Sequence, residues 1–232
     1  MRSIWRTLES ALLRDILTLA GGIAVIGASF GAIAVAAGLP WWMPCLMSVL
    51  VFAGGSQFLA VGVIAAGGGP VAAVIGGLVL NARHLPFGLA IGDVLGRTLL
   101  TRVVGSHLLI DETTAFAMAQ RDPHQARSAF WACGMTLFVS WNVGTALGVA
   151  AGQAIGDPGA FGLDAAFPAA LLAIVLPSLR DRATVRAAVV GAVVAVTATP
   201  LLPGGVPVLL ALVGLLAVGR KAPANVVAGE CR

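Results

Sequence analysis

Long apolar stretches run along almost the whole chain and are separated by short polar, glycine-rich or proline-rich turns. A helix needs about 20 apolar residues to cross the hydrocarbon core of a bilayer. The pattern predicts membrane segments over residues 16–38, 43–66, 71–91, 129–155, 165–179, 184–202 and 206–218. We therefore expect an all-α fold, a polytopic transmembrane helical bundle of about seven or eight membrane segments, some of them broken.

Residues 92–120 do not fit this simple pattern. Charged and ionisable residues lie among the apolar ones in this stretch: Asp93, Arg97, Arg102, His107, Asp111 and Glu112. Such a stretch is too polar to face lipid. Two interpretations stay open, an interfacial helix followed by a half-span, or a span packed inside the bundle.

Composition supports a membrane protein. Only 10% of the residues are charged and 59% are hydrophobic, whereas soluble domains carry about 25% charged residues. The net charge of +4 comes mostly from arginines in short loops, so a nucleic-acid partner is excluded. We expect one integral membrane transporter domain over residues 1–232, with the lipid bilayer as its surroundings.

The basic loops predict the orientation, because cytoplasmic loops carry an excess of lysine and arginine. The N-terminus, the C-terminus and the loops at 121–127 and 180–186 should be cytoplasmic. The turn at Trp41 and the acidic loop at 157–164 should lie outside. Arg97 and Arg102 are an exception, since they fall near the outer side if residues 92–120 cross once.

An internal repeat is one of two interpretations of a short sequence match. Residues 34–38 resemble residues 148–152, and both close a segment that runs outward. Internal repeats are common in transporters, and the candidate halves here are 16–120 and 129–219. Short matches also arise by chance in a chain so rich in alanine and glycine, and the two explanations carry equal weight.

Two glycine series predict close helix packing. Gly27 and Gly31 are four residues apart, as are Gly144, Gly148 and Gly152. Small residues at this spacing let two helix backbones approach in a membrane. We also expect these faces to offer docking surfaces for a partner subunit.

The first polar cluster at membrane depth comprises Gly54, Gly55, Ser56 and Gln57. Each glycine weakens a helix by about 1 kcal/mol relative to alanine. An unwound backbone in mid-membrane is tolerated only where it lines a cavity. The cluster therefore predicts a binding site in a broken helix, slightly ahead of an ordinary helix whose glycines pack against a neighbour.

The second cluster contains Asn81, Arg83, His84 and Pro86. Proline cannot donate a backbone hydrogen bond, so Pro86 should leave the carbonyl of Ala82 free. Asn81 and His84, three residues apart, should share a helix face and have a functional role. Arg83 is interpreted as lying at the end of a span, with its side chain reaching the membrane interface.

The third cluster begins with Asp111 and Glu112. Adjacent residues on a helix point about 100° apart, so the two acids should not form a pair that shares one proton. One would face the bundle while the other meets water. A proton-relay site and a polar helix N-terminus are equally favoured here.

The sequence shows no nucleophile motif, phosphate-binding loop or metal-ligand spacing. We therefore expect no enzyme activity, no catalytic residues, no cofactor and no metal. Cys45 and Cys133 lie in apolar segments and are expected to act as small hydrophobic residues.

Residues 39–92 resemble the AzlC family, the large subunit of branched-chain amino acid exporters. The motifs that carry the resemblance are Phe52-Ala53-Gly54-Gly55-Ser56-Gln57-Phe58, followed by Ala60-Val61-Gly62, and then Asn81-Ala82-Arg83-His84-Leu85. Asp111 and Glu112 with Phe116 and Ala117 also fit the family's downstream pattern. One departure is Gly55, where the family pattern has alanine.

The resemblance implies a permease of the bacterial inner membrane that works with a small AzlD-type membrane subunit. Its implied cargo is leucine, isoleucine, valine and also methionine, exported at the expense of a proton gradient. The polar groups at membrane depth, and not the resemblance, predict the site residues: substrate binding by Gly54, Gly55, Ser56, Gln57, Asn81, Phe52 and Phe58, and proton coupling by Asp111, Glu112 and His84. The alternatives are a membrane scaffold that does not transport and a membrane-embedded enzyme.

Overall fold

The computed structural model describes residues 10–154, 181–202 and 206–218, together with residues 172, 176 and 179. Within these residues the chain forms helices and turns, which confirms the all-α prediction. The predicted external loop at 157–164 and most of the predicted segment 165–179 lie outside the described residues, as do both chain ends.

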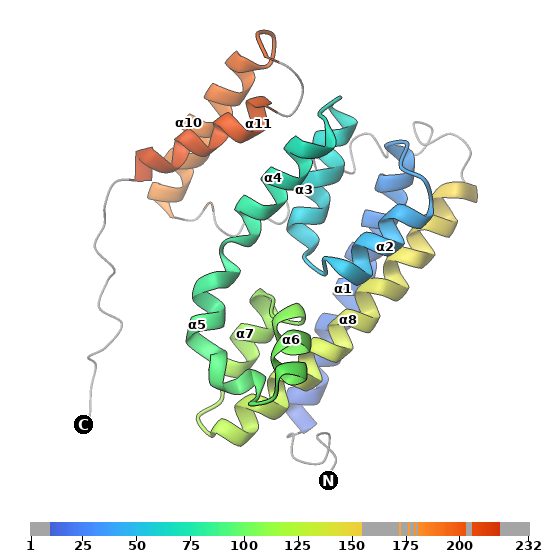
Figure 1. Ribbon diagram of the computed structural model, residues 1–232, viewed down its shortest axis with the longest axis vertical. Coiled ribbons are helices and arrows are strands. Elements are labelled where there is room, and N and C mark those ends of the chain that lie inside the picture. Colours follow the sequence, from blue (N-terminus) through green and yellow to red (C-terminus); the bar gives the residue numbers. More distant parts are fainter. Residues whose placement is uncertain are drawn as a thin grey trace.

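The two longest helices among the described residues pack along each other. Helix α1 (Ser10–Ala36) and helix α8 (Pro123–Ala154) are long and apolar enough to cross a membrane, and they run side by side in the same direction (Figure 1). A Cβ atom at Gly27 would lie 2.8 Å from the Trp141 carbonyl oxygen, and one at Gly31 would overlap the Thr145 carbonyl. Only glycine permits such an approach.

The two predicted glycine faces therefore pack against each other, since Gly144 and Gly148 meet the carbonyls of Ala24 and Ala28 on α1. The prediction of close packing is confirmed. The expectation that these faces dock a partner subunit is wrong, because the contact within the chain already covers them.

A re-entrant hairpin follows α1. Helix α2 (Trp42–Leu50) runs alongside α8 to mid-length, where Ser48 Oγ donates a 2.7 Å hydrogen bond to Asn142 Oδ1. Helix α3 (Gly54–Ala65) then returns toward the end at which α2 began (Figure 1). The interruption predicted within 43–66 is present, but the chain turns back there and does not continue as one span.

The turn between α2 and α3 lies slightly earlier than the predicted break, because Gly54 is already the first residue of α3. Phe52 has a φ of 41°, a left-handed conformation that costs a non-glycine residue about 1–3 kcal/mol. Ala53 is also outside the helical region, with φ −143° and ψ 86°. These two residues reverse the chain.

A bent span comes next. Helices α4 (Pro70–Asn81) and α5 (His84–Leu95) meet at an angle of 52° and are together long and apolar enough to cross the membrane. The predicted segment 71–91 is therefore interrupted after Asn81. The Ala82 carbonyl is not left free by Pro86, however, because the Leu85 N–H donates to it at 3.1 Å. Asn81 and His84 lie on different helices, so the prediction of a shared face is wrong.

A second re-entrant hairpin enters from the opposite end. Helix α6 (Leu99–His107) rises from the end of α5, and helix α7 (Asp111–Met118) leads back toward the start of α8 (Figure 1). A helix of nine residues is only about 14 Å long, so neither helix crosses the membrane. Of the two interpretations of 92–120, the packed span is wrong, and the stretch enters and leaves at one end.

This return removes the exception to the charge rule. A Cβ atom at Gly96 would lie 2.9 Å from Arg127 Nη2, so the end of α5 and the start of α8 share one side. Arg97 and Arg102 therefore lie at the same end as Arg121 and Arg127, which is the end where cytoplasmic residues are expected.

The topology gives a direct prediction. Reporters fused at Arg97 and after Arg127 should both read as cytoplasmic, and a reporter at Gly67, between α3 and α4, should read as external. These positions can be compared by alkaline phosphatase and green fluorescent protein fusions. An external signal at Arg97 together with a cytoplasmic one at Arg127 would contradict the second hairpin.

The C-terminal part is a helical hairpin beside α4. Helix α10 (Arg182–Ala198) packs antiparallel to the 3₁₀ helix η4 (Ala211–Val218). The short helix α11 (Val206–Leu210) lies between these two elements in the sequence and leads directly into η4. A Cβ atom at Gly76 of α4 would lie 3.7 Å from Leu209. The described residues hold up to three candidate spans, so the predicted seven or eight segments and the repeat halves remain predictions.

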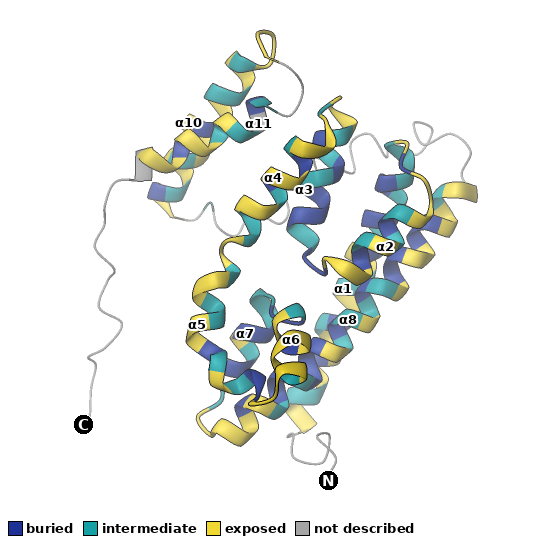
Figure 2. Ribbon diagram, viewed as in Figure 1, coloured by how far each residue is buried: buried dark blue, intermediate teal, exposed yellow. Residues whose placement is uncertain are grey.

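The buried core lies where α1, α3, α7 and α8 meet (Figure 2). Its largest fully buried side chains include Phe30, Phe58, Phe130 and Leu137. Many leucine and valine side chains on the outer faces are exposed. Such an exterior is what a bundle surrounded by lipid tails requires.

Candidate functional site

Three interruptions of helical structure meet beside the middle of α8. They are the turn before α3, the bend between α4 and α5, and the tip between α6 and α7. Together with α1 and α8 they line a cavity of about 150 Å³, a size that accepts a benzene-sized group. Its apolar wall consists of Ile23, Ile26, Phe52, Phe58, Ile110 and Trp141.

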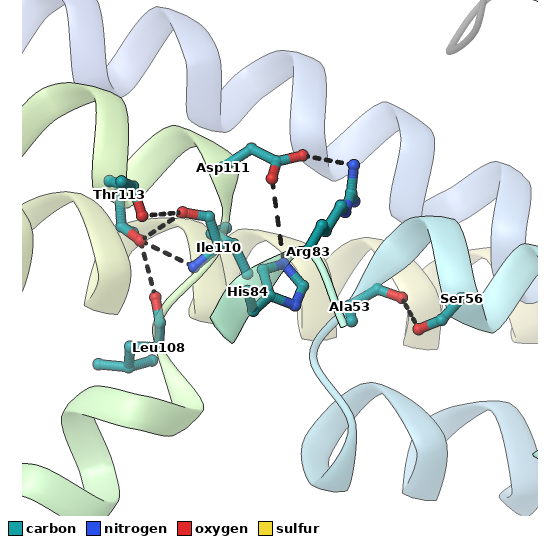
Figure 3. A network of polar contacts seen from close by, with 9 residues as sticks. Ala53, Ser56, Arg83, His84, Leu108, Ile110, Asp111 and Thr113 are labelled. Atoms are coloured by element: carbon teal, nitrogen blue, oxygen red, sulfur yellow. Dashed lines mark hydrogen bonds and ion pairs between the residues drawn. The ribbon is translucent and has the colours of Figure 1, made fainter. Parts of the chain in front are cut away.

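The polar wall of this central cavity contains charges of both signs. Arg83 Nη1 lies 2.8 Å from Asp111 Oδ2, and His84 Nε2 lies 4.0 Å from Asp111 Oδ1 (Figure 3). The side chains of Arg83 and Asp111 are 43% and 41% exposed. Glu112 completes this wall.

The interpretation of Arg83 as an arginine that reaches the membrane interface is wrong. The bend after Asn81 turns the Arg83 side chain toward α7, where Asp111 supplies an opposite charge. An ionisable residue at membrane depth is expected to pair in this way. Asp111 is distant from Arg83 in the sequence, so no local pattern could identify it as the partner. The sequence showed only that an arginine lies within an apolar segment.

The tip of the second hairpin holds both acids at the cavity. Asp111 and Glu112 are the first two residues of α7, so the alternative of a helix N-terminus describes their local structure. Thr113 Oγ1 accepts a hydrogen bond from the Ile110 N–H at 2.9 Å and lies 2.9 Å from the Leu108 carbonyl oxygen, to which it donates. Both acids line the cavity, contrary to the expectation that they separate.

The N-terminus of α3 forms another part of the wall. No side chain caps it, and the first N–H groups of a helix have no partner within the helix and carry partial positive charge. Inside the turn, Ser56 Oγ donates to the Ala53 carbonyl at 2.9 Å, and Gln57 Oε1 accepts from the Ala53 N–H at 3.3 Å. Gly54 and Gly55 line the cavity.

The two glycines differ in the space around them. A Cβ atom at Gly54 would lie 3.0 Å from the Trp141 ring, which is a tight contact. One at Gly55 would lie 3.5 Å from Leu80 and 3.6 Å from Arg83 Nη2. These are ordinary contacts, so the structure accommodates the alanine that the family pattern has in place of Gly55.

Three predicted binding residues lie elsewhere. Ser56, Gln57 and Asn81 line a second cavity of about 340 Å³ between α2, α3 and α4. Gln57 Nε2 and Asn81 Oδ1 are buried there without a hydrogen-bond partner. The other seven predicted residues line the central cavity. The single predicted site is therefore divided between two sides of α3.

Trp141 is a cavity residue that the sequence did not indicate. Its ring stacks on Phe30, with centroids 5.7 Å apart, and meets Phe58 edge-on at 6.4 Å. Its Nε1 is buried and has no hydrogen-bond partner. A tryptophan within an apolar span has the same sequence surroundings as an aromatic residue that only packs in the core. No local signal therefore marked Trp141 as a cavity residue.

No group of three or more His, Cys, Asp or Glu side chains is placed to hold a metal within the described parts of the chain. In the central cavity a guanidinium, two carboxyl groups and an imidazole lie around an apolar space.

A comparison with protein families decides the identity of this arrangement. The model of the AzlC protein family matches residues 18–155, more than half of the chain. The chain belongs to the AzlC family. The matched part of this AzlC-family chain contains the central cavity and all three helix interruptions.

Two relatives extend the comparison. The chain is 26% identical to the branched-chain amino acid transport protein AzlC of Bacillus subtilis, over 94% of this chain and 87% of that protein. It is also 26% identical to an uncharacterised membrane protein of Haemophilus influenzae, over 55% of this chain and 53% of that protein. No solved structure matches the AzlC-family chain. Its family-level function is transport.

Proposed function

We propose that this AzlC-family chain binds branched-chain amino acids in its central cavity and exports them. The observation that supports this most strongly is the composition of the cavity wall. An apolar half formed by Phe52, Phe58 and Trp141 faces a half that carries charges of both signs. Leucine, isoleucine and valine are zwitterions with apolar side chains and need both halves.

The interrupted helices suit such a cargo. Half-helix N-termini near mid-membrane offer N–H groups to anionic groups, and unwound carbonyls accept from cations. Gly54 and Gly55 place the α3 N-terminus in the cavity wall. The two hairpins enter from opposite ends of the bundle, which suits a site reached in turn from each side.

The finer features of transport are also proposals. Export driven by the proton gradient would use Asp111, Glu112 and His84, which line one wall. A small AzlD-type membrane subunit would dock on the lipid-facing exterior, since the glycine faces are covered. The bacterial inner membrane, with both termini cytoplasmic, is the proposed location.

Efflux from vesicles tests the function. Inverted vesicles containing the full chain and its small partner should take up labelled valine when a proton gradient is imposed, and leucine and isoleucine should compete. The chain without the partner should show little uptake. No valine movement by the complex, with valine binding also absent, would favour the scaffold or enzyme alternative.

Proton coupling has its own prediction at Glu112. Replacing Glu112 with glutamine should abolish gradient-driven transport but preserve exchange of valine across the membrane, because acids at membrane depth are the usual proton carriers. Asp93→Asn, outside the cavity lining, is the matched control. Normal gradient-driven uptake by Glu112→Gln would remove this residue from the coupling mechanism.

A further inference from the structure

The ion pair of Arg83 and Asp111 joins two interrupted elements across the central cavity. Arg83 lies at the bend between α4 and α5, and Asp111 begins α7. The 2.8 Å pair uses only one oxygen of Asp111, while Oδ1 has no hydrogen-bond partner. Both side chains are partly exposed and line the cavity, so both can reach a small molecule.

Arg83 also lies beside the N-terminus of α3. A Cβ atom at Gly55 would be 3.6 Å from Arg83 Nη2, and no side chain caps this helix end. An anion placed there would meet the guanidinium and the free N–H groups of the helix together. Arginine is suited to carboxylate, because its planar fork donates two parallel hydrogen bonds.

We propose that Arg83 and Asp111 recognise the two charges of the cargo, Arg83 binding the carboxylate and Asp111 the ammonium group. The inference rests on the proposed function and adds the residues that select a zwitterion. In the empty protein the two side chains neutralise each other. In the loaded protein each exchanges its partner for the opposite charge of the cargo.

Electrostatics gives the reason for selection. An unpaired charge inside a membrane protein is expensive. A zwitterion that separates Arg83 from Asp111 leaves all four charges paired. An amine without a carboxylate, or a carboxylate without an amine, leaves one protein charge unpaired and binds weakly.

Two neighbouring groups compete for these roles. His84 Nε2 is 4.0 Å from Asp111, and Glu112 lines the same wall. Arg83 Nη1 lies closer to Asp111, at 2.8 Å, and is therefore the main partner of this carboxylate. Because both groups line the cavity, the comparison variant for Asp111 is at Asp93, which lies outside the lining.

The test measures binding of three probes to the full-length chain in lipid nanodiscs: L-valine, L-valinamide, which lacks the carboxylate, and isovalerate, which lacks the ammonium group. Arg83→Gln should weaken valine binding about tenfold to hundredfold and leave valinamide binding unchanged or stronger. Asp111→Asn should weaken valine binding similarly and leave isovalerate binding unchanged or stronger. Asp93→Asn, outside the cavity lining, should not change the ranking of the probes.

Two further variants separate recognition from a structural role. Arg83→Lys keeps the charge without the planar fork and should lose valine affinity only a few-fold, which serves if Arg83→Gln does not fold. The exchanged pair Arg83→Asp with Asp111→Arg should restore thermal stability but not valine binding. Equal losses for valine and valinamide in Arg83→Gln, or valine binding restored in the exchanged pair, would overturn the inference. Absence of valine binding by the wild-type chain would instead overturn the proposed function.

Discussion

Replacing Gly148 with leucine is expected to prevent this protein from reaching its folded state. A Cβ atom at Gly148 would overlap the Ala28 carbonyl of α1, and helix backbone cannot move aside as a flexible side chain can. Overpacking a core by single methylene groups costs about 1–3 kcal/mol. A leucine would separate α1 from α8, the helix pair on which both hairpins are assembled.

The measurement is the yield of monodisperse protein after detergent extraction, with thermal unfolding of whatever is recovered. Gly22→Leu is the matched control, because a Cβ atom at Gly22 meets nothing within 4 Å. The control should express and unfold like the wild type. A Gly148→Leu protein with normal yield and normal Tm would show that α1 and α8 do not pack through this face.

The second large effect is expected at Gly54, but on cargo binding and not on folding. A leucine there would press on the Trp141 ring, which is held from its other sides by Phe30 and Phe58. The side chain would displace Trp141 or fill the central cavity itself. We expect valine affinity to fall by about a hundredfold or more, the equivalent of roughly 3 kcal/mol, in a protein that still inserts.

Two comparisons sharpen this result. Gly55→Ala should have a much smaller effect, since its Cβ atom would make only ordinary contacts. Gly92→Leu on α5 meets nothing within 4 Å and should bind valine like the wild type. Equilibrium binding to purified variants with unchanged Tm decides the matter. Equal affinities for Gly54→Leu and Gly92→Leu would place the binding site elsewhere.

The position of the first helix break could be predicted from the sequence, but the direction of the chain after it could not. Glycine and polar residues act locally, so the series at Gly54 indicated an interruption close to where it occurs. A segment that crosses and one that turns back have the same hydropathy. The turn-back of α2 and α3 depends on contacts such as Ser48 with Asn142, which no local pattern encodes.

Local patterns also explain which residues of the candidate site could be predicted and which could not. Asp111 and Glu112 were indicated because acids are rare in apolar segments, and they do line the central cavity. Gln57 and Gly55 are close in sequence, yet they line different cavities because helical residues point in different directions. Arg83 was misinterpreted because its partner lies on α7, and the bend that brings the two together is a tertiary feature.

The hydrogen bond between Ser48 and Asn142 also has a consequence for biogenesis. The ribosome makes α2 and its turn long before it makes α8, the helix that supplies Asn142. Non-helical backbone is stable at membrane depth only when protein or a cavity surrounds it, so the turn at Phe52 has no suitable environment when it first leaves the translocon. The first hairpin must therefore settle into the bilayer late, after α8 has been inserted, and its final depth is decided by assembly of the bundle and not by the order of synthesis.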